Sequence, residues 1–281
     1  MIVVTGATGN VGRSLVQSLA AAGRQVTATS RSISAADVPQ GVRHHPADLT
    51  DPDTLRPAFE GADALFLQNG GSSAHLLDPY AILDVAKAAG ITRVVLLSSQ
   101  GAATRPESAS HGGTARAIED AVKQSAPDWT ILRPSGFDSN AYAWAETIRS
   151  RRVVAAPFAD VGLPMIDPAD IAEVAAATLR GDGHAGRIHE LTGPALVTPR
   201  QAAQAIGDAL GEPVRLDELT RAEARAQMLQ FMPGPVVDTT LDILGTPTPA
   251  EQRVSPDAEQ LLGRRPRTFA DWAHDHTSAF R

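Results

Sequence analysis

Short runs of β-branched and aliphatic residues alternate with longer segments of helical periodicity through the first half of the chain. The runs predict strands at Ile2–Thr5, Gln25–Ser30, Val42–His45, Ala64–Gln68, Arg93–Ser98 and Trp129–Arg133. Strands that alternate with helices in this way are typical of a parallel sheet wrapped by helices. The first half of the chain therefore predicts an α/β fold.

The segments between these strands predict helices that begin near Val11, Pro52, Pro79 and Thr114. Gly23 and Gly90 stand where two of these helices should end, because glycine adopts the left-handed conformation of a helix C-terminus without strain.

After about residue 150 the alternation of strand-like and helical segments becomes less regular, and prolines become frequent. This half predicts helices near Pro168, Pro199 and Arg221, short strands around Val153 and Arg187, a mobile proline-rich loop over Met232–Pro256, and a final helix over Phe269–Ala279. We therefore expect a sheet-containing domain over residues 1–150. A smaller α+β capping region would follow over residues 151–281, and some of its strands could join the main sheet.

The composition narrows the class of protein. The 281 residues are 43% hydrophobic, which allows a substantial core, and a net charge of −7 gives no general attraction to nucleic acid or anionic membranes. No apolar stretch approaches the roughly 18 residues of a spanning helix, and Met1–Val4 leaves no room for a leader peptide before the first turn. Cysteine is absent, which excludes disulfides and thiolate chemistry. We expect a cytoplasmic protein that binds neither nucleic acid nor membranes.

A glycine-rich segment, Thr-Gly-Ala-Thr-Gly-Asn-Val-Gly at residues 5–12, follows the first strand and opens the first helix. Gly6 permits a tight turn, Gly9 lets the backbone approach a ligand, and Gly12 allows close packing of helix on strand. The N–H groups and dipole of the helix start favour phosphate. With a second strand about twenty residues further on, the segment predicts a dinucleotide site in a doubly wound Rossmann sheet.

The end of the second predicted strand distinguishes the two nicotinamide cofactors. An acidic residue there would bind the ribose 2′-hydroxyl of NAD and repel a 2′-phosphate. The chain instead has Ser30, Arg31 and Ser32, and a guanidinium can grip a phosphate and stack on adenine. Asp48 and Leu49 follow the third strand, where the carboxylate can accept from the adenine amino group or cap the next helix. NADP(H) is therefore the preferred cofactor, with NAD(H) as the alternative.

These segments resemble the NmrA-like family of atypical short-chain dehydrogenases/reductases, which bind NAD(P) and include quinone-reductase-like members. The matching segments are residues 5–12 (TGATGNVG), 29–31 (TSR), 47–52 (ADLTDP), 96–99 (LLSS), 129–134 (WTILRP), 164–172 (PMIDPADIA) and 190–194 (ELTGP). They span nearly the whole chain, and they are more specific for the family than for a reaction.

The resemblance implies where the cofactor would lie. The pyrophosphate would be held by Gly6, Thr8, Gly9, Asn10 and Val11, and the 2′-phosphate by Arg31. Further cofactor contacts would come from Gln68, Asn69, Ser98 and Ser99 at strand ends, and from Pro134, Ser135, Gly136 and Phe137 near the nicotinamide. These positions follow strands at the carboxyl edge of the sheet, where open α/β folds bind their ligands.

The wider short-chain dehydrogenase group uses a Tyr-x-x-x-Lys pair, in which the ammonium group lowers the tyrosine pKa for proton exchange with a carbonyl oxygen. The tyrosines and lysines of this chain are Tyr80, Tyr142, Lys87 and Lys123, and no two have that spacing. Counted back from Glu119, where the family often has a helical glutamate, the tyrosine position is His111 and the lysine position is Ala115.

Three explanations of the missing pair stay open. The protein can be a regulator that senses NADP(H) without chemistry, or His111 can donate the proton, because imidazole titrates near neutrality. In the third, the substrate needs no strong acid, which suits quinones and conjugated aromatic carbonyls such as aromatic polyketides; catalysis is then mainly proximity. We predict an NAD(P)H-dependent oxidoreductase of this third kind. A tailoring role, in which the reduced aromatic product reacts with O₂, is a further alternative.

The candidate residues for a flat aromatic or quinone substrate are Gln100, Phe137, Tyr142, Trp144, Met165, Met228 and Phe231. Such side chains also fill ordinary cores, so only their grouping would count. Ser110 and Gly112 flank His111 and suggest a flexible loop with an exposed histidine. The His274-Asp275-His276 triplet lacks a further ligand, so we predict no metal site. The sequence leaves open a protein partner or a homodimer.

Overall fold

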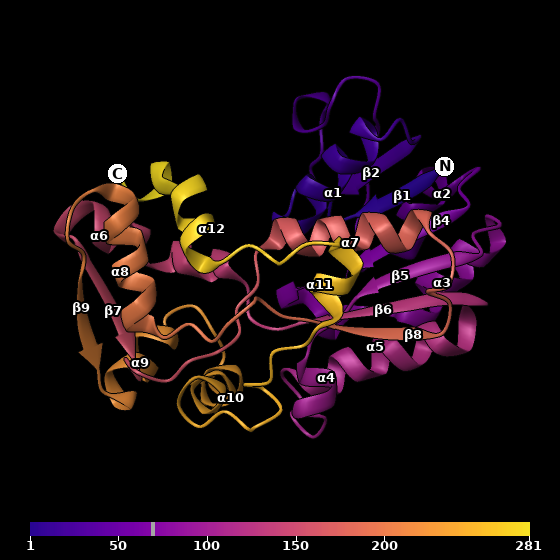
Figure 1. Cartoon of the computed structure of the whole chain (residues 1–281). Helices are drawn as coiled ribbons and strands as arrows, with labels where there is room; N and C mark the ends of the chain where they lie inside the picture. Colours follow the sequence, from indigo (N-terminus) through magenta and orange to yellow (C-terminus); the bar gives the residue numbers. More distant parts are fainter. Residues whose placement is uncertain (69–70) are drawn as a thin grey trace. The chain divides into compact units, whose positions relative to one another are not determined.

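The computed structural model describes residues 1–68 and 71–281. Across these residues the chain forms a seven-stranded sheet, a two-stranded sheet and a set of helices (Figure 1). The chain divides into two compact units. The first comprises Met1–Glu107, Gly112–Pro134 and Pro168–Glu190, and the second comprises Ser108–His111, Ser135–Asp167 and Leu191–Arg281.

The first unit is built on the larger sheet. Its strands are β1 (Ile2–Thr5), β2 (Val26–Ser30), β3 (Arg43–Pro46), β4 (Ala64–Gln68), β5 (Arg93–Leu97), β6 (Asp128–Pro134) and β8 (Arg187–Leu191). They lie in the order β3-β2-β1-β4-β5-β6-β8, and each neighbouring pair from β3 to β6 is parallel (Figure 1). The strand order reverses between β1 and β4, and ligands of open α/β sheets bind at the carboxyl ends beside such a reversal. The predicted Rossmann fold is confirmed.

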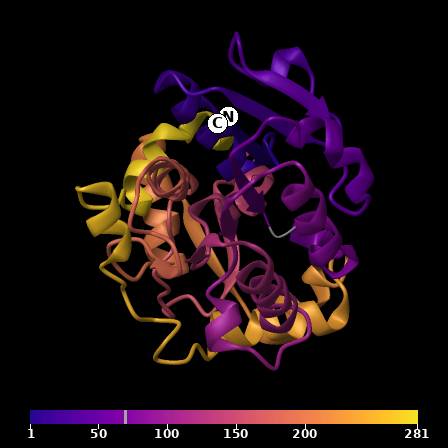
Figure 2. The same ribbon diagram turned by 90° about the vertical axis from the view of Figure 1, so that its right-hand side faces the viewer.

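Helices cover both faces of this sheet (Figure 2). They are α1 (Asn10–Ala21), α2 (Arg56–Phe59), α3 (Pro79–Ala88), α4 (Gly101–Thr104), α5 (Gly112–Ser125) and α7 (Pro168–Arg180), with 3-10 turns η1 (Ala35–Asp37), η2 (Pro52–Leu55) and η3 (Gly71–Leu76). Helix α1 packs against α7, and α3 packs against α5.

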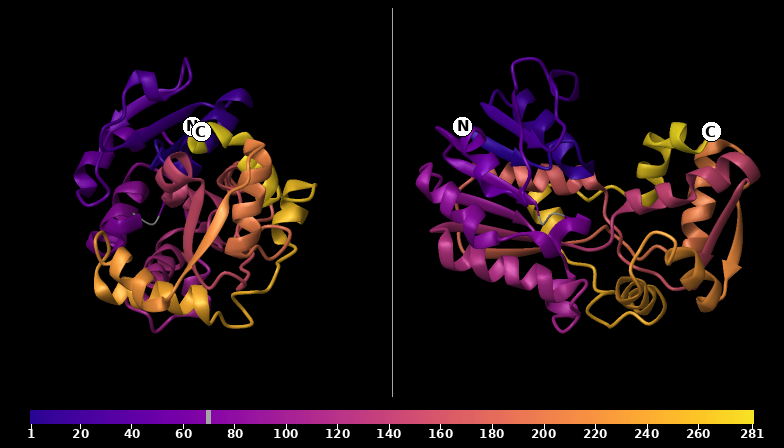
Figure 3. Two further views of the ribbon diagram at one scale, coloured as in Figure 1. Left: turned by 90° about the vertical axis from the view of Figure 1, so that its left-hand side faces the viewer. Right: turned by 180° about the vertical axis from the view of Figure 1, so that it is seen from behind.

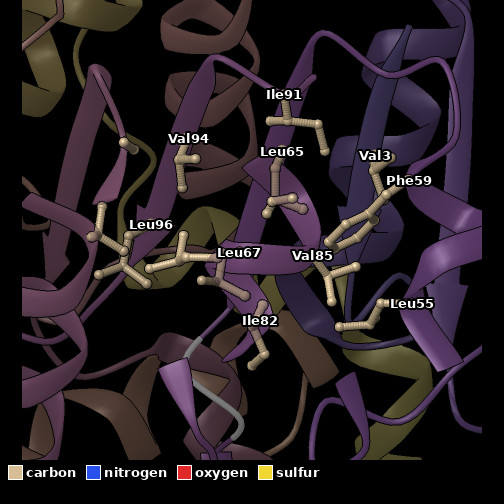
Figure 4. Close-up of a cluster of buried hydrophobic side chains, with 14 of the residues drawn as sticks. Val3, Leu55, Phe59, Leu65, Leu67, Ile82, Val85, Ile91, Val94 and Leu96 are labelled. Atoms are coloured by element: carbon tan, nitrogen blue, oxygen red, sulfur yellow. The ribbon is translucent and has the colours of Figure 1, made fainter. Parts of the chain in front are cut away.

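An aliphatic core joins α2, α3 and α5 to one face of the sheet (Figure 4). Leu65 and Leu67 of β4 share this face because alternate strand residues point to the same side. Both pack with Phe59 and Ile82, and all four side chains are fully buried. Each such burial stabilises the fold by about 1.5–3 kcal/mol. The core thereby holds the central strands, whose carboxyl ends form the candidate site.

The second unit has a small sheet in which β7 (Val153–Pro157) pairs in parallel with β9 (Arg215–Leu219). Its helices are α6 (Ala145–Arg151), α8 (Pro199–Leu210), α9 (Arg221–Met228), α10 (Gly234–Gly245), α11 (Asp257–Leu262) and α12 (Phe269–Asp275), with 3-10 turns η4 (Asp138–Trp144) and η5 (Thr277–Phe280). Helix α8 packs on both strands (Figure 3, right). The buried side chains of Trp272 and Phe280 belong to the hydrophobic core that α6, β7, α8 and α12 share.

The structure confirms the six strands predicted for the first half, with ends that shift by no more than one residue. Gly23 and Gly90 have positive φ angles of 69° and 86° directly after the C-caps of α1 and α3, as predicted. The helices expected near Pro79, Pro168 and Pro199 begin at those residues.

One local prediction was wrong, and one predicted helix begins where expected but as a 3-10 turn. The expected loop over Met232–Pro256 contains α10, because Pro233 precedes this helix and Pro235 lies in its first turn, where a missing N–H costs nothing. The helix expected near Pro52 is a 3-10 turn followed by a single helical turn, since Pro57 cannot donate a backbone hydrogen bond there.

The boundaries of the two units also differ from the division predicted at residue 150. Residues 168–190, which form α7 and the start of β8, return to the first unit and extend its sheet. Packing explains why α7 belongs to the first unit, because this helix packs against α1 and contacts β4, β5 and β6.

Candidate functional site

The glycine-rich turn lies at the carboxyl end of β1 and requires glycine at two positions. Gly6 has a φ of 62°, and a Cβ there would come within 2.6 Å of the Gln68 side chain. A Cβ on Gly12 would collide with the Gly6 carbonyl oxygen and approach the Ala7 Cα to 2.9 Å. The backbone of the turn therefore lies directly against α1, as the sequence predicted.

The turn presents the start of α1 to solvent. The Gly9 N–H donates to the Gly6 carbonyl (2.9 Å), and Gly9 and Asn10 are exposed while Val11 is buried. The first turn of α1, which the structure describes in full, carries no acidic side chain. Backbone N–H groups and the positive end of the helix dipole at such an exposed helix start favour an anion such as a diphosphate.

Hydrogen bonds fix the neighbouring strand ends around this turn. The Thr5 hydroxyl donates to the Phe66 carbonyl (3.0 Å) and accepts from the Gln68 N–H (3.0 Å), which ties β1 to β4. The Thr8 hydroxyl donates to the Ser30 hydroxyl (3.2 Å), which ties the turn to the end of β2. Thr8, Ser30 and Gln68 are thus brought together, as predicted, at one edge.

Arg31 is exposed immediately after β2, and Asp48 follows β3. Hydrogen bonds from the Thr50 N–H and hydroxyl, both 2.9 Å, together with the nearby charge of Arg31, hold the pKa of the Asp48 carboxyl below its usual value. Asp48 is therefore a charged turn-forming residue beside Arg31. Leu49 packs onto the apolar core rather than toward solvent.

The ends of β5 and β6 carry a buried ion pair that the sequence did not predict. The Glu119 carboxylate on α5 is fully buried and accepts from Arg133 Nε (2.8 Å) and Nη2 (2.6 Å) and from the Ser98 hydroxyl (2.6 Å). Lys123 Nζ lies 3.4 Å from the same carboxylate. Burial opposes ionisation, but the hydrogen bonds from Arg133 and Ser98 outweigh it and lower the pKa of Glu119.

The backbone after β5 is tied to β6 at the same place. The Ser98 N–H donates to the Leu132 carbonyl (2.8 Å), and the Gln100 N–H donates to the Pro134 carbonyl (2.9 Å). The Ser99 hydroxyl accepts from the N–H of Gly101, the first residue of α4 (3.1 Å). The predicted Asn69 lies outside the described residues.

His111 belongs to the second unit and differs from the exposed residue that its flanking sequence suggested. It is half-buried, and both of its ring nitrogens have hydroxyl partners. Its Nδ1 lies 3.0 Å from the Ser110 hydroxyl, and its Nε2 lies 3.2 Å from the Thr240 hydroxyl of α10. Ser110 also contacts Thr239, at 3.3 Å. Hydroxyl groups of α10 thus orient the imidazole.

The candidate substrate residues of the second unit occupy three places. Phe137 forms a backbone bridge with Ile166, and a Cβ on Gly136 would lie 3.0 Å from the Met165 sulfur, so the two segments that carry Phe137 and Met165 are adjacent. The Ser135 hydroxyl donates to the Pro164 carbonyl (2.5 Å) and ties the same two segments together.

The other candidates lie elsewhere in that unit. Tyr142 packs edge-on to Trp272, with ring centroids 5.2 Å apart, and burial followed by the charge of Asp167 raises the pKa of Tyr142. Trp144 packs on the same aromatic core. Met228 covers a small cluster between α9 and α10, and Phe231 is 72% exposed. The structure therefore groups only part of the predicted set, and Gln100 belongs to the first unit.

One cavity of about 480 Å³ opens at the amino edge of the large sheet, lined in part by Arg24, Asp63 and Arg93. Two of its charges are held in ion pairs, since Asp63 binds the Met1 ammonium group and Arg93 binds Asp128 (2.7 Å). Ligands of parallel sheets bind at the opposite edge, so this cavity is not the candidate site.

The described residues include no group of three or more histidine, aspartate or glutamate side chains that could hold a metal ion. The ring of His276 instead stacks on Trp272, with centroids 4.8 Å apart. No described helix is long and apolar enough to cross a membrane.

Strand order, glycine turn and exposed helix start together define a dinucleotide-binding protein of the Rossmann class. A family model described as NAD(P)H-binding matches residues 6–182. The chain therefore belongs to this NAD(P)H-binding family, which includes the NmrA-like reductases. The cofactor fits these residues, because the exposed start of α1 carries no acidic side chain and Arg31 is exposed after β2.

Named relatives cover the whole chain. A (4-alkanoyl-5-oxo-2,5-dihydrofuran-3-yl)methyl phosphate reductase from Streptomyces griseus subsp. griseus is 36% identical, over 100% of this chain and 99% of the relative. An NAD(P)H azoreductase from Xenophilus azovorans is 30% identical, with the same coverage. The NADPH complex of an NADPH-dependent quinone oxidoreductase from Escherichia coli has a TM-score of 0.81 and 26% identity, over 98% of this chain and 99% of that one. The protein is an NAD(P)H-dependent oxidoreductase.

Proposed function

We propose that the protein reduces quinones or other conjugated carbonyl compounds, aromatic polyketides among them, with NADPH as the preferred reductant. The observation that carries this proposal is the missing Tyr-x-x-x-Lys pair. Tyr80 is exposed on α3 and bonded to Gln124 (3.2 Å), and Tyr142 packs in an aromatic core. Ala115, at the family's lysine position, is buried. A substrate that needs no strong acid fits this set of residues.

The reaction places modest demands on the chain's own groups. The bound reduced nicotinamide supplies a hydride, and a conjugated acceptor spreads the resulting negative charge over its carbonyl oxygen and ring. One proton completes the reduction, and we assign its delivery to His111 or to water. The remaining task is to hold the reactants in contact, a proximity effect that can contribute several kcal/mol, of order 7–11 at most.

We assign the diphosphate to the glycine turn and the start of α1, and the 2′-phosphate to Arg31 with Ser30. The exposed helix start and the exposed guanidinium after β2 support this assignment. For the substrate, we assign Phe137 and Met165, because they lie together after the strand that ends at Pro134.

The names of the relatives support the same class of substrate. A quinone, an azo compound and a dihydrofuranone whose ring double bond is conjugated with two carbonyl groups are all electron-poor π systems. We infer that electron-poor π systems of this kind accept a hydride without prior protonation by a strong acid.

Oxidation of NADPH, followed by its absorbance, tests the proposal against a panel of acceptors. We expect turnover with quinones and with doubly activated enones, and none with simple ketones, which would require an acid of the tyrosine type. Reduction of simple ketones at comparable rates would contradict the proposal. Tight NADPH binding without turnover of any acceptor would favour a regulator.

His111→Ala tests the source of the proton. We expect kcat to fall by about tenfold or less with a quinone, and by about a hundredfold with an enone whose product anion is less delocalised. Steady-state kinetics with both acceptors measure the difference. Tyr80→Phe is the control, since this tyrosine is exposed on α3, and it should change neither rate. Equal rates for His111→Ala and the wild type with both acceptors would remove His111 from the reaction.

A further inference from the structure

The buried contacts at the ends of β5 and β6 serve no step of the reaction described above. Glu119 reaches the sheet from α5 and has no solvent exposure, yet its carboxylate is held by Ser98, Arg133 and Lys123. A buried ion pair of this kind is often no more stabilising than apolar side chains of the same volume. Its presence at this position therefore indicates a geometric role.

The ion pair acts on the strand ends that face the ligand edge. Ser98 directly follows β5, and Arg133 is the penultimate residue of β6. The backbone bonds from the Ser98 N–H to the Leu132 carbonyl and from the Gln100 N–H to the Pro134 carbonyl tie these two ends together. A shift of the Arg133 side chain would therefore displace the residues that follow β5.

Glu119 also determines what the Ser98 hydroxyl can do. A serine hydroxyl has a single proton, and here that proton is donated to the Glu119 carboxylate over 2.6 Å. Ser98 is almost wholly buried (3% exposed), and any further hydrogen bond of its hydroxyl, including one to a ligand, is one that it accepts. Donors of the matching kind on a nicotinamide nucleotide are the carboxamide N–H groups and the ribose hydroxyls.

The order of the strands identifies which half of the cofactor these ends serve. Arg31 after β2 lies on one side of the glycine turn, and β5 and β6 lie on the other, beyond β4. A dinucleotide whose phosphorylated adenosine lies at β2 and whose diphosphate lies at α1 extends toward β4, β5 and β6 with its nicotinamide half.

We propose that Glu119 is a positioning residue that, through Ser98 and Arg133, fixes the ends of β5 and β6 as an acceptor edge for the nicotinamide half of the cofactor. This role does not depend on which conjugated substrate is reduced. It goes beyond the proposed function because it assigns a task to a residue that contacts neither the adenosine site nor the substrate residues.

Calorimetry with two probes tests this role. Glu119→Gln and Ser98→Ala should each weaken NADPH binding by about tenfold, the effect of one charge-assisted hydrogen bond. Adenosine 2′,5′-bisphosphate carries only the adenosine half, and its affinity should change by less than about twofold. The losses of the two single variants should not add in the double variant, because Glu119 acts on the cofactor through Ser98. The fluorescence of bound NADPH should shift in parallel with the lost affinity.

Thr130→Val is the matched control. It removes a buried hydrogen bond of β6, from the Thr130 hydroxyl to the His184 carbonyl (2.9 Å), three residues before Arg133. This variant should bind both probes as the wild type does. If Glu119→Gln fails to fold, Ser98→Ala with the same probes decides the outcome. Equal weakening of both probes, or unchanged NADPH affinity and fluorescence, would overturn the proposal. A wild type that bound neither probe would instead contradict the cofactor assignment.

Discussion

Replacing Gly12 with alanine is expected to weaken NADPH binding by about a hundredfold or more. The added methyl group would meet the backbone of Gly6 and Ala7 rather than a side chain, so α1 must move away from the turn. Two charge-assisted hydrogen bonds to the diphosphate, each about 1.5–3 kcal/mol, would then be lost. Overpacking should also lower the free energy of unfolding by about 1–3 kcal/mol. Calorimetry and denaturant unfolding measure the two effects.

Gly23→Ala is the control for this change. Gly23 follows the other end of the same helix with a φ of 69°, and a Cβ there would meet nothing within 4 Å. Alanine in that conformation costs about 1–2 kcal/mol of strain but leaves the start of α1 in place. Its NADPH affinity should equal that of the wild type. If Gly12→Ala also bound NADPH normally, the turn would not be the diphosphate site.

Replacing Arg31 with alanine is expected to weaken NADPH binding by about 10–100-fold while NADH binding stays the same. The guanidinium would lose a charge-assisted contact to the 2′-phosphate, about 1.5–3 kcal/mol, and NADH has no such phosphate. The preference for NADPH should fall by the same factor. The wild-type preference should also decline with salt, because Arg31 is exposed. Dissociation constants for both nucleotides at two salt concentrations measure this.

Arg24→Ala provides a comparison with the same change in net charge. Arg24 is exposed just before β2, at the amino edge of the sheet. It should leave both dissociation constants within about twofold. If Arg31→Ala weakened the binding of NADPH and NADH equally, Arg31 would not bind the 2′-phosphate.

The alternation of β-branched runs with helical segments predicted the sheet well, because strands in the middle of a parallel sheet are buried on both faces. β1 and β4 match their predicted ends, and both consist of buried residues over most of their length. The missed strand β9 reads Arg-Leu-Asp-Glu-Leu and is largely solvent-facing. Its composition resembles a surface helix, and only pairing with β7 makes it a strand.

The cofactor edge was predictable because glycine spacing and strand ends are local features. The Glu119–Arg133 pair was not, since it depends on how α5 packs against β6. A signal was present, however: Arg133 stands between apolar residues at the end of a buried strand, where an arginine needs a buried partner. The substrate residues scatter because the packing of helices in the second unit is set by tertiary contacts that the sequence pattern does not encode.

The chain passes from one unit to the other after Glu107, His111, Pro134, Asp167 and Glu190. A truncation near residue 150 would strip α7 from α1 and leave β6 with an open edge, and such an edge invites aggregation. Because each unit is assembled from separate segments of the chain, we expect that neither folds when it is expressed as one contiguous fragment. New substrate preferences in such a chain are then expected to arise by point substitution and loop variation rather than by exchange of a whole domain.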